Sequence, residues 1–358
     1  MYLTKTDRTL LGAVKKEHVM RAVGYQKSLL ITDKDALVDI DLPVPEAKGH
    51  DLLVEVKAVS VNPVDTKIRK RAEPPAGEWK VLGWDAAGIV RAVGPAVRRF
   101  RPGDAVYYAG AVTRQGCDSE FHLVDERIVG KKPVTLNWAE AAALPLTAIT
   151  AWEMLFDRLD ITRPIPGVPQ CILIIGAGGG VGSMAVQLAR RLGNVTVIGT
   201  ASRPETAEWA KSLGAQYIVD HSKPLAEQVE ALGLGPVGYV FSITETDRHF
   251  AEVVKLIGPQ GRFGLIDDPP ALDVMPFKAK SVSTHWELMF TRSTFQTADM
   301  IRQAEILEEV SNLVDAGLLQ TTLSEVLGPI NATTLRHAHV LLESGKVRGK
   351  IVLEGFGG

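Results

Sequence analysis

The chain has 358 residues, of which 46% are hydrophobic and 23% charged, with two cysteines and a formal net charge of −2. This composition is typical of a globular protein with room for two domains, and the near-neutral charge gives no basis for a nucleic-acid partner. Two cysteines exclude a disulfide framework, no apolar run approaches the roughly 20 residues of a membrane span, and the N-terminus lacks a cleavable signal pattern. We therefore expect a cytoplasmic protein with no membrane partner.

The N-terminal third of the chain has the pattern of short strands. A strand pattern begins at Met20, so residues 1–19 are expected to be an N-terminal extension. From Met20 to about Trp138, short β-rich runs are separated by closely spaced glycines and prolines, which favours a compact β-barrel-like domain. The clearest expected strands cover residues 52–61, 86–94, 104–110 and 119–124. A helix follows over residues 139–156, and Pro145 is expected to interrupt it.

A glycine-rich segment from Cys171 to Gly193 predicts a strand, a tight turn and a helix. Its glycines at 176, 179 and 182 are three residues apart, which allows a sharp turn, the close approach of a pyrophosphate and close packing of the helix on the strand. The free N–H groups at the start of the helix would then face the phosphates. We expect a dinucleotide to bind here, with contacts made by Gly176, Gly179, Gly180, Val181 and Gly182.

Strands alternate with helices after this segment, which predicts a parallel, doubly wound sheet. The expected strands cover residues 171–176, 195–201, 216–220, 238–243 and 261–266, and the clearest helices between them cover 204–214 and 249–258. An irregular stretch, a helix at about 297–316 and a final strand at 349–356 follow, and this last strand is expected to return to the first domain. We therefore divide the chain into 1–19 (extension), 20–148 (first domain), 149–289 (nucleotide-binding domain) and 290–358 (return to the first domain).

Several sequence blocks in a fixed order carry a family resemblance. They are VSVNPVDTKIR (59–69), GWDAAGIVRAVG (83–94), FRPGDAVY (100–107), LPLTAITAWE (144–153) and GAGGGVGSMAVQLA (176–189). With these blocks the chain resembles the medium-chain dehydrogenase/reductase superfamily, in particular its quinone oxidoreductase branch, and bacterial proteins described as zinc-type alcohol dehydrogenase-like. The resemblance implies an α/β fold with two parts, a GroES-like β-barrel-type catalytic domain and a Rossmann domain with a doubly wound parallel sheet.

The zinc ligands of this superfamily are missing from the matching positions. Zinc dehydrogenases place a cysteine where this chain has Asn62 and a His-Glu pair where it has Trp84 and Asp85, and no four-cysteine lobe is present. The remaining candidate ligands, which we interpret as a turn and a half-buried strand, are Cys117, Asp118, Glu120 and His122. We therefore expect no bound metal. Without a Lewis acid, reduction of an electron-poor acceptor is favoured over reversible alcohol oxidation.

The end of the second strand of the parallel sheet indicates the cofactor. NAD-specific enzymes usually carry Asp or Glu there, whereas this chain has Ala201 and Ser202, followed by Arg203. A guanidinium beside a hydroxyl suits a 2′-phosphate, so NADPH is the expected cofactor. His221 and Lys346 are further candidates by family position, and for both of them an exposed surface position is the alternative.

The resemblance implies that the acceptor binds beside a loop that follows the strand at 52–61 and runs from Asn62 to Lys67. Asn62 could donate a hydrogen bond through its amide, and Asp65 could orient the segment. Many quinone reductases have a tyrosine where this chain has Lys67, whose ammonium could stabilise an enolate or point to solvent. Tyr107 and Tyr108 end a strand and point to opposite faces, so at most one of them is expected to reach the site, and Tyr107 is our candidate.

The nicotinamide side of the site is expected from the same resemblance. Thr150 matches a position that commonly contacts this part of the cofactor, although its hydroxyl could instead bond within its own helix, and Leu265 and Ile266 should line the nicotinamide pocket. The resulting hypothesis is NADPH-dependent reduction of a quinone or an α,β-unsaturated carbonyl by a homodimer. The alternatives are a zinc-type alcohol dehydrogenase and a non-catalytic NADPH-binding protein, because the fold alone does not decide function.

Overall fold

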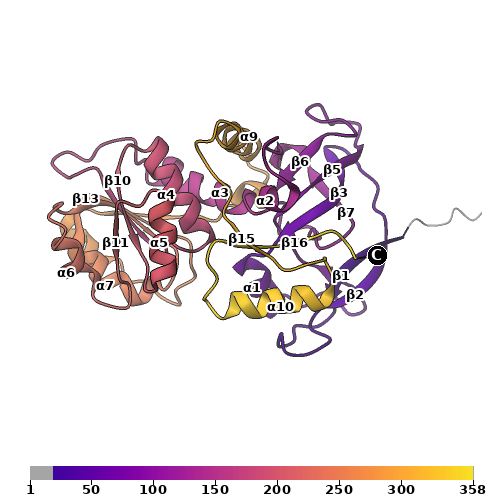
Figure 1. Ribbon diagram of the computed structural model, residues 1–358, viewed down its shortest axis with the longest axis horizontal. Coiled ribbons are helices and arrows are strands. Elements are labelled where there is room, and N and C mark those ends of the chain that lie inside the picture. Colours follow the sequence, from indigo (N-terminus) through magenta and orange to yellow (C-terminus); the bar gives the residue numbers. More distant parts are fainter. Residues whose placement is uncertain (1–18, 358) are drawn as a thin grey trace, which may run out of the picture.

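The computed structural model describes residues 19–357. They form two parts side by side, one built around β1–β8 and the other around β9–β14, with β15 and β16 returning to the first part (Figure 1). The expected N-terminal extension lies outside the described residues except for Val19, which already belongs to the first strand. None of the helices described is both long enough and apolar enough to cross a membrane.

The first part is centred on β3, a ten-residue strand whose side chains alternate between buried and half-buried positions. It pairs in antiparallel fashion with β5, β7 and β16. The strands of this seven-stranded sheet are β3 (Asp51–Ser60), β5 (Ala86–Val93), β6 (Ala105–Tyr108), β7 (Phe121–Asp125), β8 (Val129–Lys131), β15 (Leu323–Val326) and β16 (Lys350–Glu354). A smaller sheet beside it contains β1 (Val19–Tyr25), β2 (Val38–Pro43) and β4 (Lys80–Val81). The predicted strands of this region are therefore confirmed, with ends that differ by a few residues.

A helix occupies the segment after β3 that the sequence analysis treated as a loop. This helix, α1 (Pro63–Arg71), has Asn62 as its N-cap residue, Pro63 at its first position and Asp65 in its first turn. Proline is favoured at the first helical position, and a carboxylate in the first turn is stabilised by the helix N-terminus. These signals were present in the sequence, so the expectation of a loop was wrong.

The connection between the two parts is helical and breaks at Pro145 as predicted. Two short α-helices are followed by a π-helical segment, in which the backbone is wider than in an α-helix. These elements are α2 (Trp138–Ala142), α3 (Pro145–Trp152) and η2 (Glu153–Arg158). Every residue of α3 is buried, so this helix lies in the interior between the two parts.

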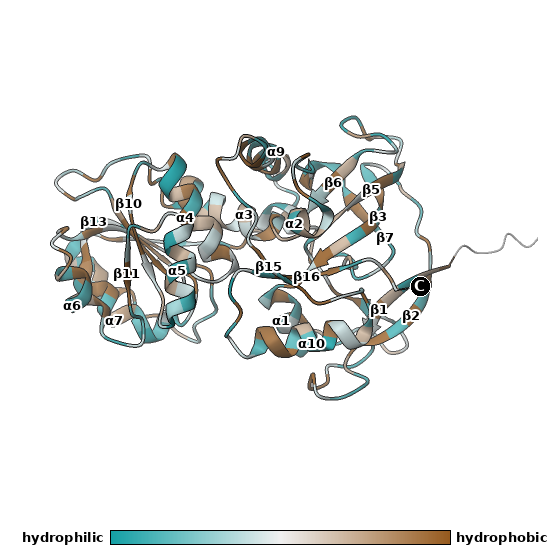
Figure 2. Cartoon of the chain, in the orientation of Figure 1, coloured by the Kyte–Doolittle hydropathy of each residue, from teal (hydrophilic) through white to brown (hydrophobic). Residues whose placement is uncertain are grey.

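The second part is a six-stranded parallel sheet in the order β11-β10-β9-β12-β13-β14. The strands are β9 (Cys171–Ile175), β10 (Thr196–Thr200), β11 (Tyr217–Val219), β12 (Val237–Ser242), β13 (Ile257–Leu265) and β14 (Ser283–Trp286). The helices that cover it include α4 (Gly180–Leu192), α5 (Pro204–Ser212), α6 (Leu225–Glu230) and α7 (Thr246–Leu256). Figure 2 shows apolar strands inside and hydrophilic helix faces outside, which is the pattern of a doubly wound sheet.

The chain then returns to the first part. Between β13 and β15 lie η3 (Met275–Lys280), α8 (Thr291–Phe295) and α9 (Arg302–Asp315), and α10 (Ala332–Glu343) precedes the last strand. β16 pairs with β3 so that Val352 lies opposite Ser60. The start of β16 also contacts the glycine-rich turn, because Gly349 donates its N–H to the carbonyl of Gly178 at 3.0 Å. The C-terminal strand therefore joins the two parts at the point where the site is built.

Candidate active site

Three glycines of the loop, Gly176, Gly179 and Gly182, each meet a different structural requirement. Gly176 follows β9 directly and has a φ of +89°, a conformation that L side chains rarely adopt. A Cβ on Gly182 would lie 2.1 Å from the carbonyl oxygen of Gly176, so the helix packs too closely on the turn for any side chain there. A Cβ on Gly179, in contrast, would meet nothing closer than 3.6 Å. Gly179 therefore leaves open space at the loop, which a phosphate needs for a close approach.

The loop leads directly into the N-terminus of α4. Gly179 is the N-cap residue and has no side chain to satisfy the first N–H groups, and Gly180 and Val181 begin the helix. Four N–H groups at a helix start lack partners within the helix, and together with the helix dipole they attract anions. The described residues thus fit a dinucleotide diphosphate at this place.

The adenosine side of the site contains the expected arginine and a second one that the sequence analysis missed. The Arg203 guanidinium donates to the carbonyl of Lys346 at 2.9 Å and lies 3.4 Å from Glu205. Lys346 therefore contributes its carbonyl to this contact. Arg348 stacks over the ring of Trp209, 4.9 Å from its centroid. Ser202 is exposed and Arg203 half-buried directly after β10, and neither Ala201 nor Ser202 supplies the carboxylate that binds a ribose in NAD enzymes.

His221 is connected to the glycine loop through one hydroxyl. Its Nδ1 lies 3.0 Å from Oγ1 of Thr200, and the same oxygen accepts the N–H of Gly176 at 3.0 Å. Burial lowers the pKa of His221, so the imidazole is neutral at pH 7. His221 therefore helps to fix the turn, and a contact with the cofactor stays a prediction.

On the acceptor side, Asn62 belongs to a closed and buried hydrogen-bond network. Its amide nitrogen donates to the carbonyl of Ser60 at 3.2 Å and to Asp85 Oδ2 at 2.9 Å. Its amide oxygen accepts from the ammonium of Lys350. Both amide hydrogens are thus in use, and the expected donation from Asn62 to an acceptor would require one of these bonds to break.

The centre of this network is an ion pair between Lys350 and Asp85. The two charged atoms are 3.1 Å apart, and the side chains are 4% and 0% exposed. Lys350 also donates to the carbonyl of Val61 at 2.8 Å, and the other oxygen of Asp85 accepts the N–H of Leu146 at 2.8 Å. Burial raises the pKa of Asp85, and the nearby ammonium opposes this rise.

The network joins the segment after β3 to the glycine-rich loop, and its cation, Lys350, was not among the residues expected from the sequence. The stem of Lys350 packs so closely on the loop that a Cβ on Gly180 would lie 2.8 Å from its Cδ atom. A lysine within the apolar run of the last strand was the available signal, because a buried ammonium needs an anionic or carbonyl partner. Its partner, Asp85, was noted only as the residue that stands at a zinc-ligand position of the superfamily.

Asp65 supports the same segment from within α1. Its Oδ2 accepts the backbone N–H of Asn62 at 2.6 Å, which is the orienting contact expected for it. Burial raises its pKa to about 7, and the N–H of Asn62 opposes that rise. Its Oδ1 atom has no hydrogen-bond partner among the described residues. Asp65 can therefore hold a proton near neutral pH.

The remaining candidates on the acceptor side are placed outside this network. The Lys67 ammonium lies 3.0 Å from Asp268 and is partly exposed. The Tyr107 hydroxyl donates to the carbonyl of Leu307 at 2.5 Å, so this side chain packs against α9. The hydroxyl proton of Tyr107 is thus engaged with a backbone carbonyl of α9, and a catalytic role for Tyr107 stays a prediction. Tyr108 bonds to His122 at 3.1 Å.

The residues expected on the nicotinamide side lie at the junction of the two parts. The Thr150 hydroxyl donates to the carbonyl of Leu146, one turn earlier in α3, at 2.8 Å. This is the local bond that was the alternative for Thr150, and it leaves the hydroxyl oxygen free to accept. Leu265 is buried at the end of β13 and Ile266 is half-buried after it, at the carboxyl edge of the sheet where ligands of such folds bind.

The side chains at the zinc-ligand positions do not fit a metal. The oxygen of Asn62 faces an ammonium, the indole N–H of Trp84 donates to the carbonyl of Ala111 at 3.1 Å, and Asp85 is paired with Lys350. His122 uses both ring nitrogens, toward Tyr108 and the carbonyl of Gln115, and Glu120 binds Arg21. Across residues 19–357, no group of three or more His, Cys, Asp or Glu side chains is arranged to hold a metal ion.

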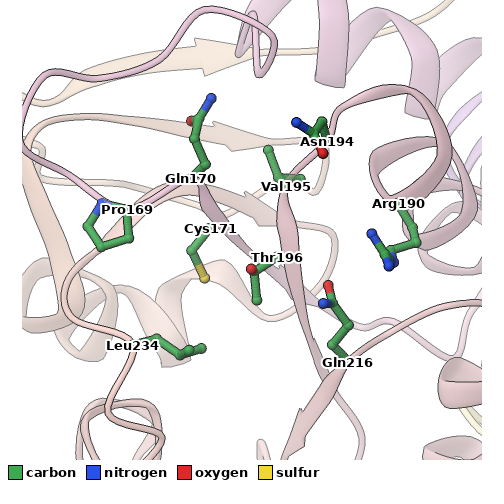
Figure 3. A pocket seen from close by; sticks show the side chains of 9 residues that line it. All are labelled: Pro169, Gln170, Cys171, Arg190, Asn194, Val195, Thr196, Gln216 and Leu234. Atoms are coloured by element: carbon green, nitrogen blue, oxygen red, sulfur yellow. The ribbon is translucent and has the colours of Figure 1, made fainter.

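A separate surface hollow of about 310 Å³ lies at the opposite edge of the parallel sheet (Figure 3). It begins at Cys171, the first residue of β9, whereas the glycine turn follows the last residue of that strand. Its lining residues are Pro169, Gln170, Cys171, Arg190, Asn194, Val195, Thr196, Gln216 and Leu234. Ligands of open α/β sheets bind at the carboxyl ends of the strands, so we do not place the active site in this hollow.

Comparison with known proteins agrees with this geometry. A family model for zinc-binding dehydrogenases matches residues 180–314, and one for the alcohol dehydrogenase GroES-like domain matches residues 48–144. A zinc-type alcohol dehydrogenase-like protein of Staphylococcus aureus (strain MRSA252) is 38% identical over 339 residues, covering 93% of this chain and 99% of the relative. A chloroplastic quinone-oxidoreductase homolog of Spinacia oleracea is 29% identical over 348 residues, covering 96% and 99% of the two chains.

The similarity extends to solved structures. The crystal structure of a protein from Rhizobium etli CFN 42, described as a zinc-dependent alcohol dehydrogenase, is 63% identical with a TM-score of 0.93, covering 95% of this chain and 99% of the other. The expected fold class, a GroES-like domain with a Rossmann-type parallel sheet, is thereby confirmed. The chain belongs to the medium-chain dehydrogenase/reductase superfamily of oxidoreductases.

Proposed function

We propose that the protein is an NADPH-dependent oxidoreductase that transfers hydride, without a metal, to a quinone or an α,β-unsaturated carbonyl compound. The observation that carries this proposal is the buried network of Asn62, Asp85 and Lys350, which occupies the zinc-ligand positions and contacts the dinucleotide loop. An acceptor that is already electron-poor does not need a Lewis acid. The quinone-oxidoreductase homolog among the relatives supports this class of acceptor.

NADPH is supported by the groups at the end of β10. Ser202 and Arg203 follow β10 and Arg348 stacks on Trp209 of α5, so a hydroxyl and two guanidinium groups are available for a 2′-phosphate, and charge-assisted hydrogen bonds to a phosphate are about twice as strong as neutral ones. When bound, the reduced nicotinamide supplies the hydride. The chain's own residues hold the diphosphate at Gly179–Val181 and shape the nicotinamide pocket with Thr150, Leu265 and Ile266.

On the acceptor side, the chain supplies orientation and a proton reservoir. Asp65 fixes the backbone of Asn62 and holds a proton near neutral pH, while the Asp85–Lys350 pair fixes the amide of Asn62. Reduction of a quinone or an enone ends with protonation of an oxygen or a carbon, so a protonated buried carboxyl close to the site suits this chemistry.

The direct test is to follow oxidation of NADPH by its nicotinamide absorbance with a panel of quinones, enones and aldehydes. We expect turnover with quinones or enones and a preference for NADPH over NADH. Binding of NADPH without turnover on the whole panel would instead indicate a non-catalytic NADPH-binding protein, and turnover restricted to aldehydes would contradict the proposed acceptor class.

A zinc-type alcohol dehydrogenase is the second candidate function, and the descriptions of two similar proteins favour it. It requires a zinc ion for which the side chains at the expected positions are not suited. Elemental analysis of the purified and dialysed protein decides between the two: we expect far less than one zinc per chain, whereas a value near one would favour the alcohol dehydrogenase.

We also propose a homodimer that forms through the edge strand β14. This strand is the outer member of the parallel sheet and pairs only with β13 among the described strands. Large apolar side chains are exposed beside it, with Trp286 at 55%, Leu288 at 62% and Phe295 at 74%. An exposed sheet edge with apolar side chains is a surface for pairing with another chain. Light scattering after size exclusion should give twice the chain mass, and a monomer mass would contradict the proposal.

A further inference from the structure

Two cations on α1 bind one carboxylate of the nucleotide-binding part. The Lys67 ammonium lies 3.0 Å from Asp268 Oδ2, and the Arg71 guanidinium lies 3.4 Å from the same oxygen. Lys67 and Arg71 are four residues apart, so they lie on one face of the helix. α1 belongs to the part built on β3, whereas Asp268 follows β13 of the parallel sheet. The three side chains therefore form an ion-pair cluster between the two parts of the molecule.

The cluster lies between the two halves of the proposed site. α1 begins directly after Asn62, which belongs to the acceptor side, and Asp268 follows two residues after Ile266, which is expected on the nicotinamide side. Hydride transfer requires the donor and acceptor carbons to be held about 3 to 3.5 Å apart. A contact that fixes Asp268 against α1 thus fixes the two sides of the site relative to each other.

Each of the two elements is also anchored within its own part. Arg69 is fully buried on the opposite face of α1 and binds Glu343 of α10 and His339. Asp267, next to Asp268, accepts the N–H of Thr246 at 2.9 Å at the start of α7. The helix and the base of the 266–274 segment are therefore each held within their own part, and Asp268 reaches from one to the other.

The three side chains of the cluster are partly exposed to solvent. The side chains of Lys67, Asp268 and Arg71 are 40%, 54% and 68% exposed. The hydrogen bond from Lys67 lowers the pKa of Asp268, so the carboxylate is ionised at neutral pH. Exposed ion pairs are screened by salt, so this contact should weaken as the ionic strength rises.

We propose that Lys67 and Arg71 are positioning residues, which hold Asp268 and thereby set the nicotinamide side of the site against the acceptor side. This inference rests on the proposed function. It gives a role to Lys67 that does not involve contact with the acceptor: its ammonium acts on the 266–274 segment.

A charge reversal tests this role against direct catalysis by Lys67. The rate of hydride transfer is measured in single turnovers with NADPH already bound, with a deuterium isotope effect to identify the step. Asp268→Lys should slow the step roughly 5- to 20-fold, because two exposed pairs are replaced by repulsion. The triple variant K67E/R71E/D268K restores the pairs with reversed charges and should recover most of the rate.

Failure of the triple variant to recover the rate would overturn the proposal and would point to an ammonium that acts on the acceptor itself. Lys70→Met is the matched control, because Lys70 is an exposed cation of the same helix that binds Glu343 within the first part, 3.1 Å away. This control should leave the rate within about twofold of the wild type.

Hydrogen exchange over residues 266–274 gives a readout that does not depend on activity. Without cofactor, Asp268→Asn should increase the exchange of this segment severalfold, and K67E/R71E/D268K should return it to the wild-type level. Unchanged exchange in Asp268→Asn overturns the inference even if the wild-type protein turns over NADPH. An inactive wild-type protein with the expected exchange pattern would refute the proposed function and leave the holding contact established.

Discussion

The two sides of the site are built in different ways. The glycine-rich loop comes from one continuous segment whose backbone N–H groups are proposed to bind the diphosphate, so the spacing of its glycines carries most of the sequence signal. The acceptor side is assembled from the end of β3, the start of β5, the start of α3 and the start of β16, and it depends on buried side chains. The comparison teaches that a binding function can be encoded locally, whereas the environment of the reacting groups is encoded by distant residues that meet only in the fold.

The largest effect should come from breaking the buried ion pair of the acceptor side. Lys350→Met leaves Asp85 buried without its cation, which typically costs about 3–5 kcal/mol of unfolding free energy. The double variant Asp85→Asn with Lys350→Met removes both charges and should recover much of that loss. Urea denaturation of both variants measures this. A loss below about 1 kcal/mol for Lys350→Met alone would show that the pair does not hold this side together.

The second test uses pH. Because the pKa of Asp65 is raised to about 7 in the folded protein, its protonated form contributes stability that is fully present below about pH 4 and is lost as the pH rises through 7. Asp65→Asn cannot lose a proton, so its stability relative to the wild type should increase by about 4 kcal/mol between pH 4 and pH 8. Burial lowers the pKa of His122 to about 4, but this affects both proteins equally and cancels in the difference. A pH-independent difference would contradict the shifted pKa.

Two glycine substitutions test whether the glycine-rich loop binds the diphosphate of the cofactor. Gly179→Ala meets no atom closer than 3.6 Å, so the free energy of unfolding should change by less than about 1 kcal/mol, but the methyl group fills the space that a phosphate needs. We expect NADPH affinity to fall by about tenfold or more. Gly182→Ala, whose Cβ would lie 2.1 Å from a carbonyl oxygen, should lower both stability and affinity. Equal NADPH affinity for Gly179→Ala and the wild type would show that the diphosphate does not bind at Gly179.

The smallest expected effect concerns cofactor choice. Arg203→Ala should lower the ratio of catalytic efficiencies with NADPH and NADH by roughly tenfold, because one charge-assisted contact to the 2′-phosphate is lost while Arg348 remains. Activity with NADH serves as the internal control and should change little. An unchanged ratio of catalytic efficiencies would show that Arg203 does not contact the 2′-phosphate.

The sequence predicted the elements whose signals are local. The five parallel strands β9–β13 follow apolar runs, the break at Pro145 follows from its missing N–H, and the sharp turn at Gly176 and the close packing at Gly182 follow from the glycine spacing. The start of α1 was also readable from Pro63 and Asp65, but the segment was treated as a loop. The fifth strand was identified, whereas β14 was not, because its four residues lie after a long irregular stretch.

The partners of buried polar side chains could not be predicted. Asn62 was identified as a candidate, but nothing near it in the sequence indicates that Lys350, 288 residues later, is buried and donates to its amide oxygen. Tyr107 shows the same limit: strand alternation gives the face on which a side chain lies, while the carbonyl of Leu307 that binds its hydroxyl comes from a helix 200 residues away. The domain boundaries at 148, 289 and 290 stay predictions.

The central claim is that the Asn62–Asp85–Lys350 network serves the acceptor side without a metal. The most direct measurement is the rate of NADPH oxidation with a quinone or enone acceptor, before and after exhaustive chelation, with the zinc content of the same samples determined. We predict that the chelated protein, with far less than one zinc per chain, retains its full activity and gains none when zinc is added back. Activity that disappears with chelation and returns with about one zinc per chain would contradict the account.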